Sequence, residues 1–268
     1  MQYQQRIFSD GLKLFYAWFE ALHTRVDLAI CSKIDQDGLV EFVKMLQIEI
    51  EKFELIGNRF DPKSEISHVN TNAYKSDVVL SNELFEILSD CQMYNHKTYG
   101  YFDIAINSTN HLKPKEEAYL LDSQKQTIRF SNSGILLDLS GFLKGYVLER
   151  LIKIAENECY ANLLINLGNS SIFAKGNHPC GKGWKIQHPE NNSDCVLLNE
   201  CLTTSGNNGK TKWPIVNPTD RVAVTTKKSV SVVTKLPAVG EVLSKVAYLA
   251  TENERDKIFE IFGARLVK

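Results

Sequence analysis

Apolar residues recur every three or four positions in five stretches of the chain, which is the spacing of an amphipathic helix. These stretches are residues 37–55, a segment that begins after Ser81, 141–158, 239–250 and 253–262. Asp35 or Asp37 suits the cap of the first helix, Ser81 the cap of the second, and Gly263 the end of the last. The pattern therefore predicts five helices, each with one buried face.

Shorter runs of β-branched and apolar residues predict strands between these helices. They are residues 25–31, 127–130, 134–139, 163–168, 182–188, 195–199, 221–226 and 229–234. The runs 127–130 and 134–139 frame a polar Ser-Asn-Ser-Gly turn, which favours a β-hairpin. Because strands and helices do not alternate strictly, we expect an α+β fold rather than a parallel α/β sheet.

Charge and composition narrow the classes of partner. The 268 residues are 43% hydrophobic, and 31 basic residues nearly balance 32 acidic ones. The chain has no excess of basic residues that would indicate a nucleic-acid partner. It also has no polybasic run that would indicate binding to an anionic membrane. The sequence has no apolar stretch of about 18 residues that could span a bilayer, and its first ten residues do not resemble a secretion signal. We therefore expect no nucleic-acid partner, no membrane span and a cytoplasmic location.

The six cysteines match no zinc signature, because none of them form a Cys-x-x-Cys pair. Three of them have apolar neighbours and are expected to be small buried residues: Cys31, Cys91 and Cys159. Reduced thiols are the simpler expectation. The alternative is a disulfide between two of the three later cysteines, which are Cys180, Cys195 and Cys201.

Residues 136–151 form a candidate phosphate site. A strand is expected to end at Asp138, and a helix is expected to begin after a turn that contains Gly141. A helix N-terminus offers N–H groups and a partial positive charge to a phosphate. Lys144 would add a full positive charge, and Gly145 would let a ligand or another backbone approach closely. A capped helix with a surface lysine is the alternative interpretation.

Seven short motifs follow one another along the chain. They are Ala21-Leu22-His23-Thr24, Pro62 to Asn70 with Ser64-Glu65-Ile66, Gly100-Tyr101-Phe102-Asp103, Asp138 with Lys144-Gly145, Asn166 to Ser170, Trp184 to Pro189, and Thr204-Ser205-Gly206. Their order and spacing resemble the ApbE family, the FAD:protein FMN transferases, over about residues 20 to 262. The resemblance implies an ApbE-like α+β fold, mainly antiparallel sheets flanked by helices, as a single domain over residues 1–268.

The same resemblance implies that the chain binds FAD and uses it as a donor of FMN. The residues implied in FAD binding are Leu22, Tyr101, Phe102, Asp103, Asp138, Lys144, Thr204, Ser205, Gly206 and Ile215. Asp138 and Lys144 are also the implied catalytic residues. A Ser or Thr hydroxyl of an acceptor protein would attack the phosphorus on the FMN side, and AMP would leave. Positioning and charge neutralisation would contribute most of the rate.

The family pattern also implies a magnesium ion, and here the chain departs from the pattern. The metal phrase Ala-Asp-x-x-Ser/Asp-Thr reads Gly-Glu-Val-Leu-Ser-Lys in this chain, which gives as implied ligands Glu241, Ser244, Lys245 and the backbone of Gly141. Glu can bind magnesium, whereas a protonated Lys cannot. Glu241 and Lys245 are four residues apart in the favourable order for a helical ion pair, so a salt bridge in place of the metal is one interpretation. Neutralisation of the diphosphate by Lys144 and Lys245 without a metal is another.

Two more motifs differ from the family. Pro214 stands where the phrase His-x-x-Asp-Pro has His, and Asn217 stands where it has Asp. Proline neither transfers a proton nor donates a hydrogen bond. In the turn Asn-x-Gly-Gly-Asp, Ser170 replaces the Asp. Three functions stay open: an active FMN transferase, a flavin-binding or interaction protein that has lost transfer, and a pyrophosphatase that splits FAD into FMN and AMP.

Overall fold

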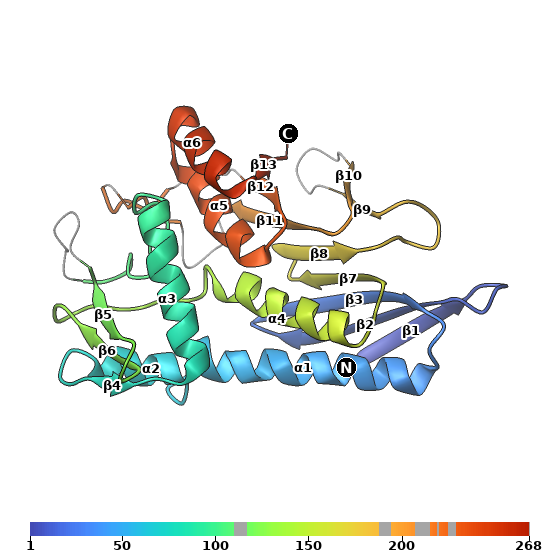
Figure 1. The fold of residues 1–268 in the computed structure, drawn as a ribbon, viewed down its shortest axis with the longest axis horizontal. Coiled ribbons are helices and arrows are strands. Elements are labelled where there is room, and N and C mark those ends of the chain that lie inside the picture. Colours follow the sequence, from blue (N-terminus) through green and yellow to red (C-terminus); the bar gives the residue numbers. More distant parts are fainter. Residues whose placement is uncertain (110–116, 188–193, 207–214, 219, 225–228, 268) are drawn as a thin grey trace. The chain divides into compact units, whose positions relative to one another are not determined.

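Eight antiparallel strands form the largest sheet of the structure, a computed structural model that describes residues 1–109, 117–187, 194–206, 215–218, 220–224 and 229–267. The strand order is β1-β2-β3-β7-β8-β11-β12-β13 (Figure 1). The bounds are β1 Gln2–Ile7, β2 Lys13–Ala21, β3 Thr24–Ser32, β7 Asn162–Leu167, β8 Ser171–Lys175, β11 Glu200–Gly206, β12 Ser229–Thr234 and β13 Arg265–Leu266. A separate two-stranded sheet pairs β9 Trp184–Gln187 with β10 Asp194–Leu197.

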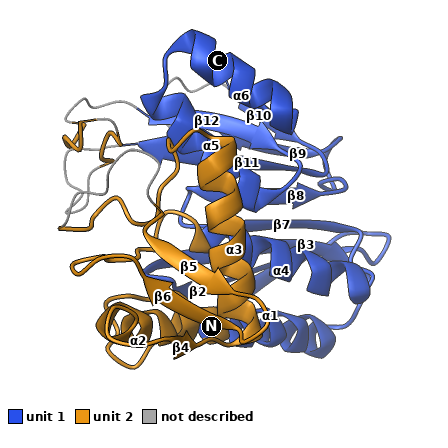
Figure 2. Cartoon of the chain, turned by 60° about the vertical axis from the view of Figure 1, so that its left-hand side comes forward, with its two compact units in different colours: residues 1–51, 144–211, 226–268 blue, residues 52–143, 212–225 orange. Residues whose placement is uncertain are grey.

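The chain divides into two compact units, each assembled from segments that are distant in the sequence (Figure 2). The first unit comprises residues 1–51, 144–211 and 226–268, and the second comprises 52–143 and 212–225. The large sheet lies wholly in the first unit. A single domain over residues 1–268 stays a prediction.

In the first unit, both faces of the large sheet are covered. Successive residues of a strand point to opposite faces, so the buried Ile30 and Cys31 of β3 belong to different layers. Cys31 packs in a small core with Trp184 of β9 and Leu197 of β10. The helices of this unit are most of α1 Gln36–Gly57 and of α4 Leu143–Asn157, together with α5 Pro237–Leu249 and α6 Glu252–Phe262. Figures 1 and 2 both show α4 beside β3 and α5 beside β11.

The second unit contains two helices and a small sheet. The helices are α2 Glu65–Asn72 and α3 Asn82–Lys97, and the sheet has the order β4-β6-β5, with β4 Val78–Val79, β6 Thr127–Phe130 and β5 Tyr119–Asp122. Ser81 caps α3 by accepting a hydrogen bond from the backbone N–H of Leu84. The Ser81 N–H and hydroxyl in turn donate to the carboxylate of Glu65, at 2.7 and 2.6 Å. These bonds fasten the start of α3 to the start of α2.

The five predicted helices are confirmed as α1, α3, α4, α5 and α6. The N–H of Gly38 donates to Asp35 at 2.9 Å, which selects Asp35 as the cap of α1, and Gly263 ends α6 with a left-handed φ of 62°. The predicted hairpin of residues 127–130 with 134–139 is wrong, because β6 pairs with β4 and β5 and residues 135–139 form no strand. Residues 98–106, which contain the Gly100 to Asp103 motif, form turns and irregular backbone.

All six cysteines are free thiols, so the disulfide alternative is not realised. Cys31 and Cys91 are buried as predicted, whereas Cys159 is exposed, in a left-handed turn at the end of α4 with φ 59°. Among the described residues, no helix combines the length and the apolar composition needed to cross a lipid bilayer.

Candidate functional site

Two tight turns meet at one end of the large sheet. Leu22 and His23 form the β2–β3 turn and both have left-handed φ values, 52° and 56°. Asn and Gly adopt left-handed φ values most easily, so Leu22 and His23 carry backbone strain in this turn. Next to this turn, the N–H of Gly168 donates to the carbonyl of Arg25 at 2.9 Å. A Cβ at Gly168 would lie 2.2 Å from the Thr24 hydroxyl oxygen, so only glycine fits where the turns touch.

The turn after β7 holds Lys144. The Lys144 ammonium, one residue into α4, donates to the hydroxyl of Ser170. Ser170 is fixed on both sides, because its hydroxyl also donates to the carbonyl of Leu167 at 3.2 Å and its own carbonyl accepts from the N–H of Thr204 at 2.8 Å. Ser170 therefore links the start of α4 to the edge of β11.

A buried carboxylate stands beside this lysine. One oxygen of Glu241, in α5, accepts from the hydroxyl of Ser171, and the other lies 3.0 Å from the ammonium of Lys245. The Glu241 and Lys245 side chains are 5% and 18% exposed, so this ion pair is largely removed from water. It confirms the predicted helical salt bridge. A Cβ at Gly145 would lie 2.6 Å from the Glu241 Cγ, so the glycine lets α5 approach α4 closely.

Hydroxyl groups continue the cluster into β11. Ser205 and Ser244 share a hydrogen bond of 2.7 Å, and the Ser244 hydroxyl donates to the carbonyl of Glu241 at 3.0 Å. Thr204, Ser205 and Gly206 are the last three residues of strand β11. The motif is thus positioned by strand pairing rather than by turn chemistry.

The cluster contains more positive than negative charge. Among the residues that the structure describes, its charged groups are the ammonium groups of Lys144 and Lys245 and the carboxylate of Glu241. Burial lowers the pKa of Lys144 from its ordinary value of 10.5; Glu241 opposes this shift, and Lys245 adds to it. A site with two ammonium groups, one carboxylate and several hydroxyls is suited to an anion rich in oxygen atoms.

Asp138, in the second unit, is held by a separate set of bonds. One carboxylate oxygen of Asp138 lies 2.8 Å from the Nε of Arg59 and accepts from the amide of Asn107 at 3.3 Å. The other oxygen accepts from the N–H of Ser140 at 2.9 Å. The Asp138 and Arg59 side chains are only 8% and 11% exposed. The Asp138 carboxylate is therefore held in a fixed position shortly before the first residue of α4.

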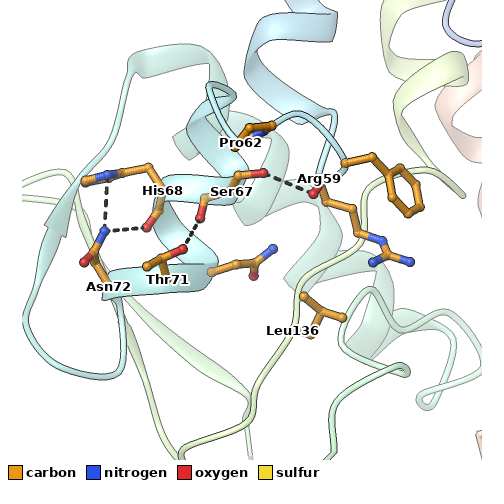
Figure 3. A pocket seen from close by; sticks show the side chains of 9 residues that line it. Arg59, Pro62, Ser67, His68, Thr71, Asn72 and Leu136 are labelled. Atoms are coloured by element: carbon orange, nitrogen blue, oxygen red, sulfur yellow. Dashed lines mark hydrogen bonds between the residues drawn. The ribbon is translucent and has the colours of Figure 1, made fainter.

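The backbone before Asp138 is held by Asn70 of α2. The Asn70 amide accepts from the N–H of Leu137 at 2.8 Å and donates to the carbonyl of Leu137 at 3.0 Å. A hollow of about 480 Å³ borders this segment and is lined by α2, Arg59 and Leu136. In Figure 3 the hydroxyls of Ser67 and Thr71 bond backbone carbonyls at 3.1 and 2.9 Å.

The Gly100 to Asp103 motif also lies in the second unit. Phe102 is 3% exposed and its ring packs on Phe142 with the centroids 5.6 Å apart, which places its side chain in the core. The Asp103 carboxylate accepts from the N–H of Ala105 at 2.7 Å. Burial raises the pKa of Asp103, while this bond and the charge of Arg221 oppose the rise.

The predicted site residues fall in both units. The first unit gathers at one end of its sheet Leu22, Lys144, Thr204, Ser205, Gly206, Glu241, Ser244 and Lys245. The second unit contains Tyr101, Phe102, Asp103, Asp138, Gly141 and Ile215. The roles of all these residues stay predictions, and Pro214 and Pro189 lie outside the described residues.

Sequence reasoning missed three contacts that hold the predicted residues in place. Arg59 pairs with Asp138, Ser170 bonds Lys144, and Ser171 bonds Glu241. Ser170 could have been predicted to lie near the site, because it ends a motif that resembles the family. Ser171 and Arg59 had no signal in the sequence.

The residues at the implied metal position do not fit a magnesium ion. Magnesium requires near-octahedral oxygen ligands at about 2.0–2.1 Å. Here Lys245 supplies an ammonium, and both carboxylate oxygens of Glu241 already accept hydrogen bonds. In the described part of the chain, no group of three or more His, Cys, Asp or Glu side chains could hold a metal ion.

Comparison with known proteins gives several matches. A model of the ApbE family matches residues 22–264. A FAD:protein FMN transferase of Chlamydia trachomatis is 27% identical over 207 residues, which are 69% of this chain and 65% of that protein. The protein of the same name from Chlamydia muridarum is 29% identical over 191 residues, which are 61% of this chain and 59% of that protein. The matched part is therefore less than two thirds of either relative.

Solved structures share the fold. The flavinyl transferase ApbE of Pseudomonas stutzeri in its apo form superposes with a TM-score of 0.80 at 14% identity, covering 98% of this chain and 94% of that one. The Vibrio cholerae flavin transferase ApbE gives a TM-score of 0.76 at 14% identity, covering 99% and 93%. These likenesses confirm the predicted α+β fold with mainly antiparallel sheets. Together with the match over residues 22–264, they establish that the chain belongs to the ApbE family.

Proposed function

We propose that this chain binds FAD and transfers its FMN to a Ser or Thr hydroxyl of an acceptor protein, with release of AMP. Family membership and the relatives named FAD:protein FMN transferase support this function. The observation that carries it is the setting of Lys144, a partly buried ammonium whose hydrogen bond goes to the neutral Ser170. The mutual placement of these two residues gives an oxygen-rich anion a fixed point of attachment.

Physical chemistry supports a phosphate ligand at this point. Partial burial of an ammonium without a dedicated carboxylate disfavours its charged form, and burial accordingly lowers the pKa of Lys144. The diphosphate of FAD would supply the missing negative charge and accept hydrogen bonds from the ammonium. Thr204 and Ser205, on the adjoining strand, are proposed as further contacts of the ligand, and Leu22 as its apolar neighbour.

The proposed reaction exchanges one phosphorus–oxygen bond for another. The acceptor oxygen bonds the phosphorus of the FMN half, the bond from that phosphorus to the AMP oxygen breaks, and the acceptor proton passes to solvent. In this step Lys144 stabilises the negative charge that develops on the departing AMP phosphate. Asp103, Asp138, Tyr101 and Ile215 stay proposed FAD contacts from the family resemblance.

The test measures FAD binding and transfer separately. Isothermal titration of the purified chain with FAD should show one site, and Lys144→Ala should weaken binding by about tenfold or more, because a charge-assisted hydrogen bond is lost. Lys153→Ala, an exposed lysine of the same helix, is the matched control and should bind as the parent does. Transfer is read from AMP release and a flavin-fluorescent acceptor band on a denaturing gel. Equal affinities for the two variants would refute this assignment of the site.

A second function is favoured by one observation. Lys245 pairs with Glu241 at the implied metal position, which supports a flavin-binding protein that does not catalyse transfer. This function predicts FAD binding with no AMP release in the presence of any acceptor, whereas the first predicts both.

A further inference from the structure

We propose that Lys245 takes the place of a divalent cation in this chain, so that Lys144 and Lys245 together bind the diphosphate of FAD without a metal. This inference rests on the proposed function. The position implied for magnesium holds the ammonium group of Lys245, at 3.0 Å from the Glu241 carboxylate.

The hydrogen bonds of Glu241 fix the Lys245 ammonium in position. Lys245 donates to the Glu241 carboxylate and to the Glu241 carbonyl, both at 3.0 Å. Ser171 holds the far oxygen of the same carboxylate. The ammonium is thus tethered at two points on its own helix, which lowers the entropy lost when it contacts a ligand.

Lys144 and Lys245 both have N–H groups that could donate hydrogen bonds to a ligand. An ammonium has three N–H donors. Within the described residues, Lys245 directs two of them to Glu241, and Lys144 directs one to Ser170. One donor of Lys245 and two of Lys144 therefore remain, and a diphosphate offers several acceptor oxygens to them.

The charge count agrees with the donor count. Among the described residues, two ammonium groups and one carboxylate give the cluster a net charge of +1. Gly145, the residue after Lys144, lies against the Glu241 side chain, which in turn pairs with Lys245. A partly buried cluster with excess positive charge is stabilised by an anion. Because the excess comes from side chains, no added cation is needed to attract the phosphates.

The deciding experiment titrates FAD into the full chain in metal-free buffer with EDTA and again with excess Mg²⁺. We expect the two dissociation constants to agree within about twofold, since less than about 0.4 kcal/mol would separate them. A loss of tenfold or more in EDTA would overturn the inference and leave the proposed FAD binding intact. An absence of binding in both buffers would overturn the proposed function together with the inference.

Two variants sharpen the result. Glu241→Asp with Lys245→Thr restores the metal phrase, and this double variant should bind FAD about tenfold more weakly in EDTA and regain affinity with Mg²⁺. Glu241→Gln with Lys245→Met is neutral and of similar shape, and it should bind weakly in both buffers. Lys257→Thr, at an exposed position of α6, serves as the control. Electron paramagnetic resonance of added Mn²⁺ should detect a bound ion only in the Asp/Thr variant; a bound ion in the parent chain would contradict the proposal.

Discussion

Gly145 of α4 lies against Glu241 of α5 so closely that a Cβ at residue 145 would stand 2.6 Å from the Glu241 Cγ and 2.6 Å from the carbonyl oxygen of Pro237. This contact is where α4, which carries Lys144, meets α5, which carries Glu241 and Lys245. The glycine is therefore a structural requirement of the cluster.

Gly145→Ala should destabilise the protein by about 1–3 kcal/mol, because the added methyl group overpacks a backbone contact. The sign is informative, since Gly→Ala within a helix normally stabilises by about 1 kcal/mol. Thermal unfolding measures the effect, and FAD affinity should fall with it as Glu241 is displaced. Gly181→Ala, where a Cβ would meet nothing within 4 Å, is the control. A higher melting temperature for Gly145→Ala would show that the two helices do not meet as described.

The sequence predicted helices better than strands, and the segment 135–139 shows why. Burial alternates along it, with Ile135, Leu137 and Leu139 inside, as in a strand. Its backbone bonds, however, go to the Asn70 side chain and the carbonyl of Ile104 rather than to a neighbouring strand. Alternation of buried and exposed residues indicates an extended backbone. Whether that backbone pairs with another strand depends on residues far away in the sequence.

The candidate site follows the same rule. The Glu241–Lys245 pair was predictable because it is local to one helix. The link from Lys144 through Ser170 to Thr204 was not, because it depends on the antiparallel pairing of β7, β8 and β11. The family resemblance identified the motifs in their order along the chain. Which of their side chains touch depends on how strands that are distant in the sequence pair with one another.

Asn70→Ala should lower stability by about 2 kcal/mol, because it leaves the N–H and carbonyl of Leu137 without their amide partner. We expect FAD affinity to fall as well, since these bonds hold the backbone next to Asp138. Asn72→Ala, on the same helix, removes only exposed bonds to His68 and should have a small effect. Urea denaturation of the two variants compares them directly, and equal midpoints would contradict the role given to Asn70.

Asp103→Asn should raise the melting temperature at neutral pH. Burial raises the folded-state pKa of Asp103 above its ordinary value of 3.8, so the folded state binds more protons than the unfolded state between the two pKa values. Stability therefore falls as pH rises through that window, and the ionised group opposes folding at pH 7. The Asn side chain keeps an oxygen that can accept from Ala105. Melting curves at neutral and at acidic pH should show the advantage of the variant shrinking as pH falls; a constant difference would disprove the titration argument.

Lys144 should make stability and FAD affinity change in opposite directions with pH. Burial lowers its folded-state pKa below 10.5, with Glu241 and Lys245 as the charged groups that act on it. Between the lowered pKa and 10.5 the unfolded state binds more protons, so apo-protein stability gains a contribution as pH rises through this window. The phosphates of FAD favour the protonated lysine, so FAD affinity should decline over the same range. Melting temperature and FAD titration from neutral pH up to 10.5, the ordinary pKa of lysine, test both trends against Lys144→Met, in which the part of each slope due to Lys144 should disappear. If Lys144→Met reproduced both slopes of the parent chain, the ammonium of Lys144 would not be the group that meets the ligand.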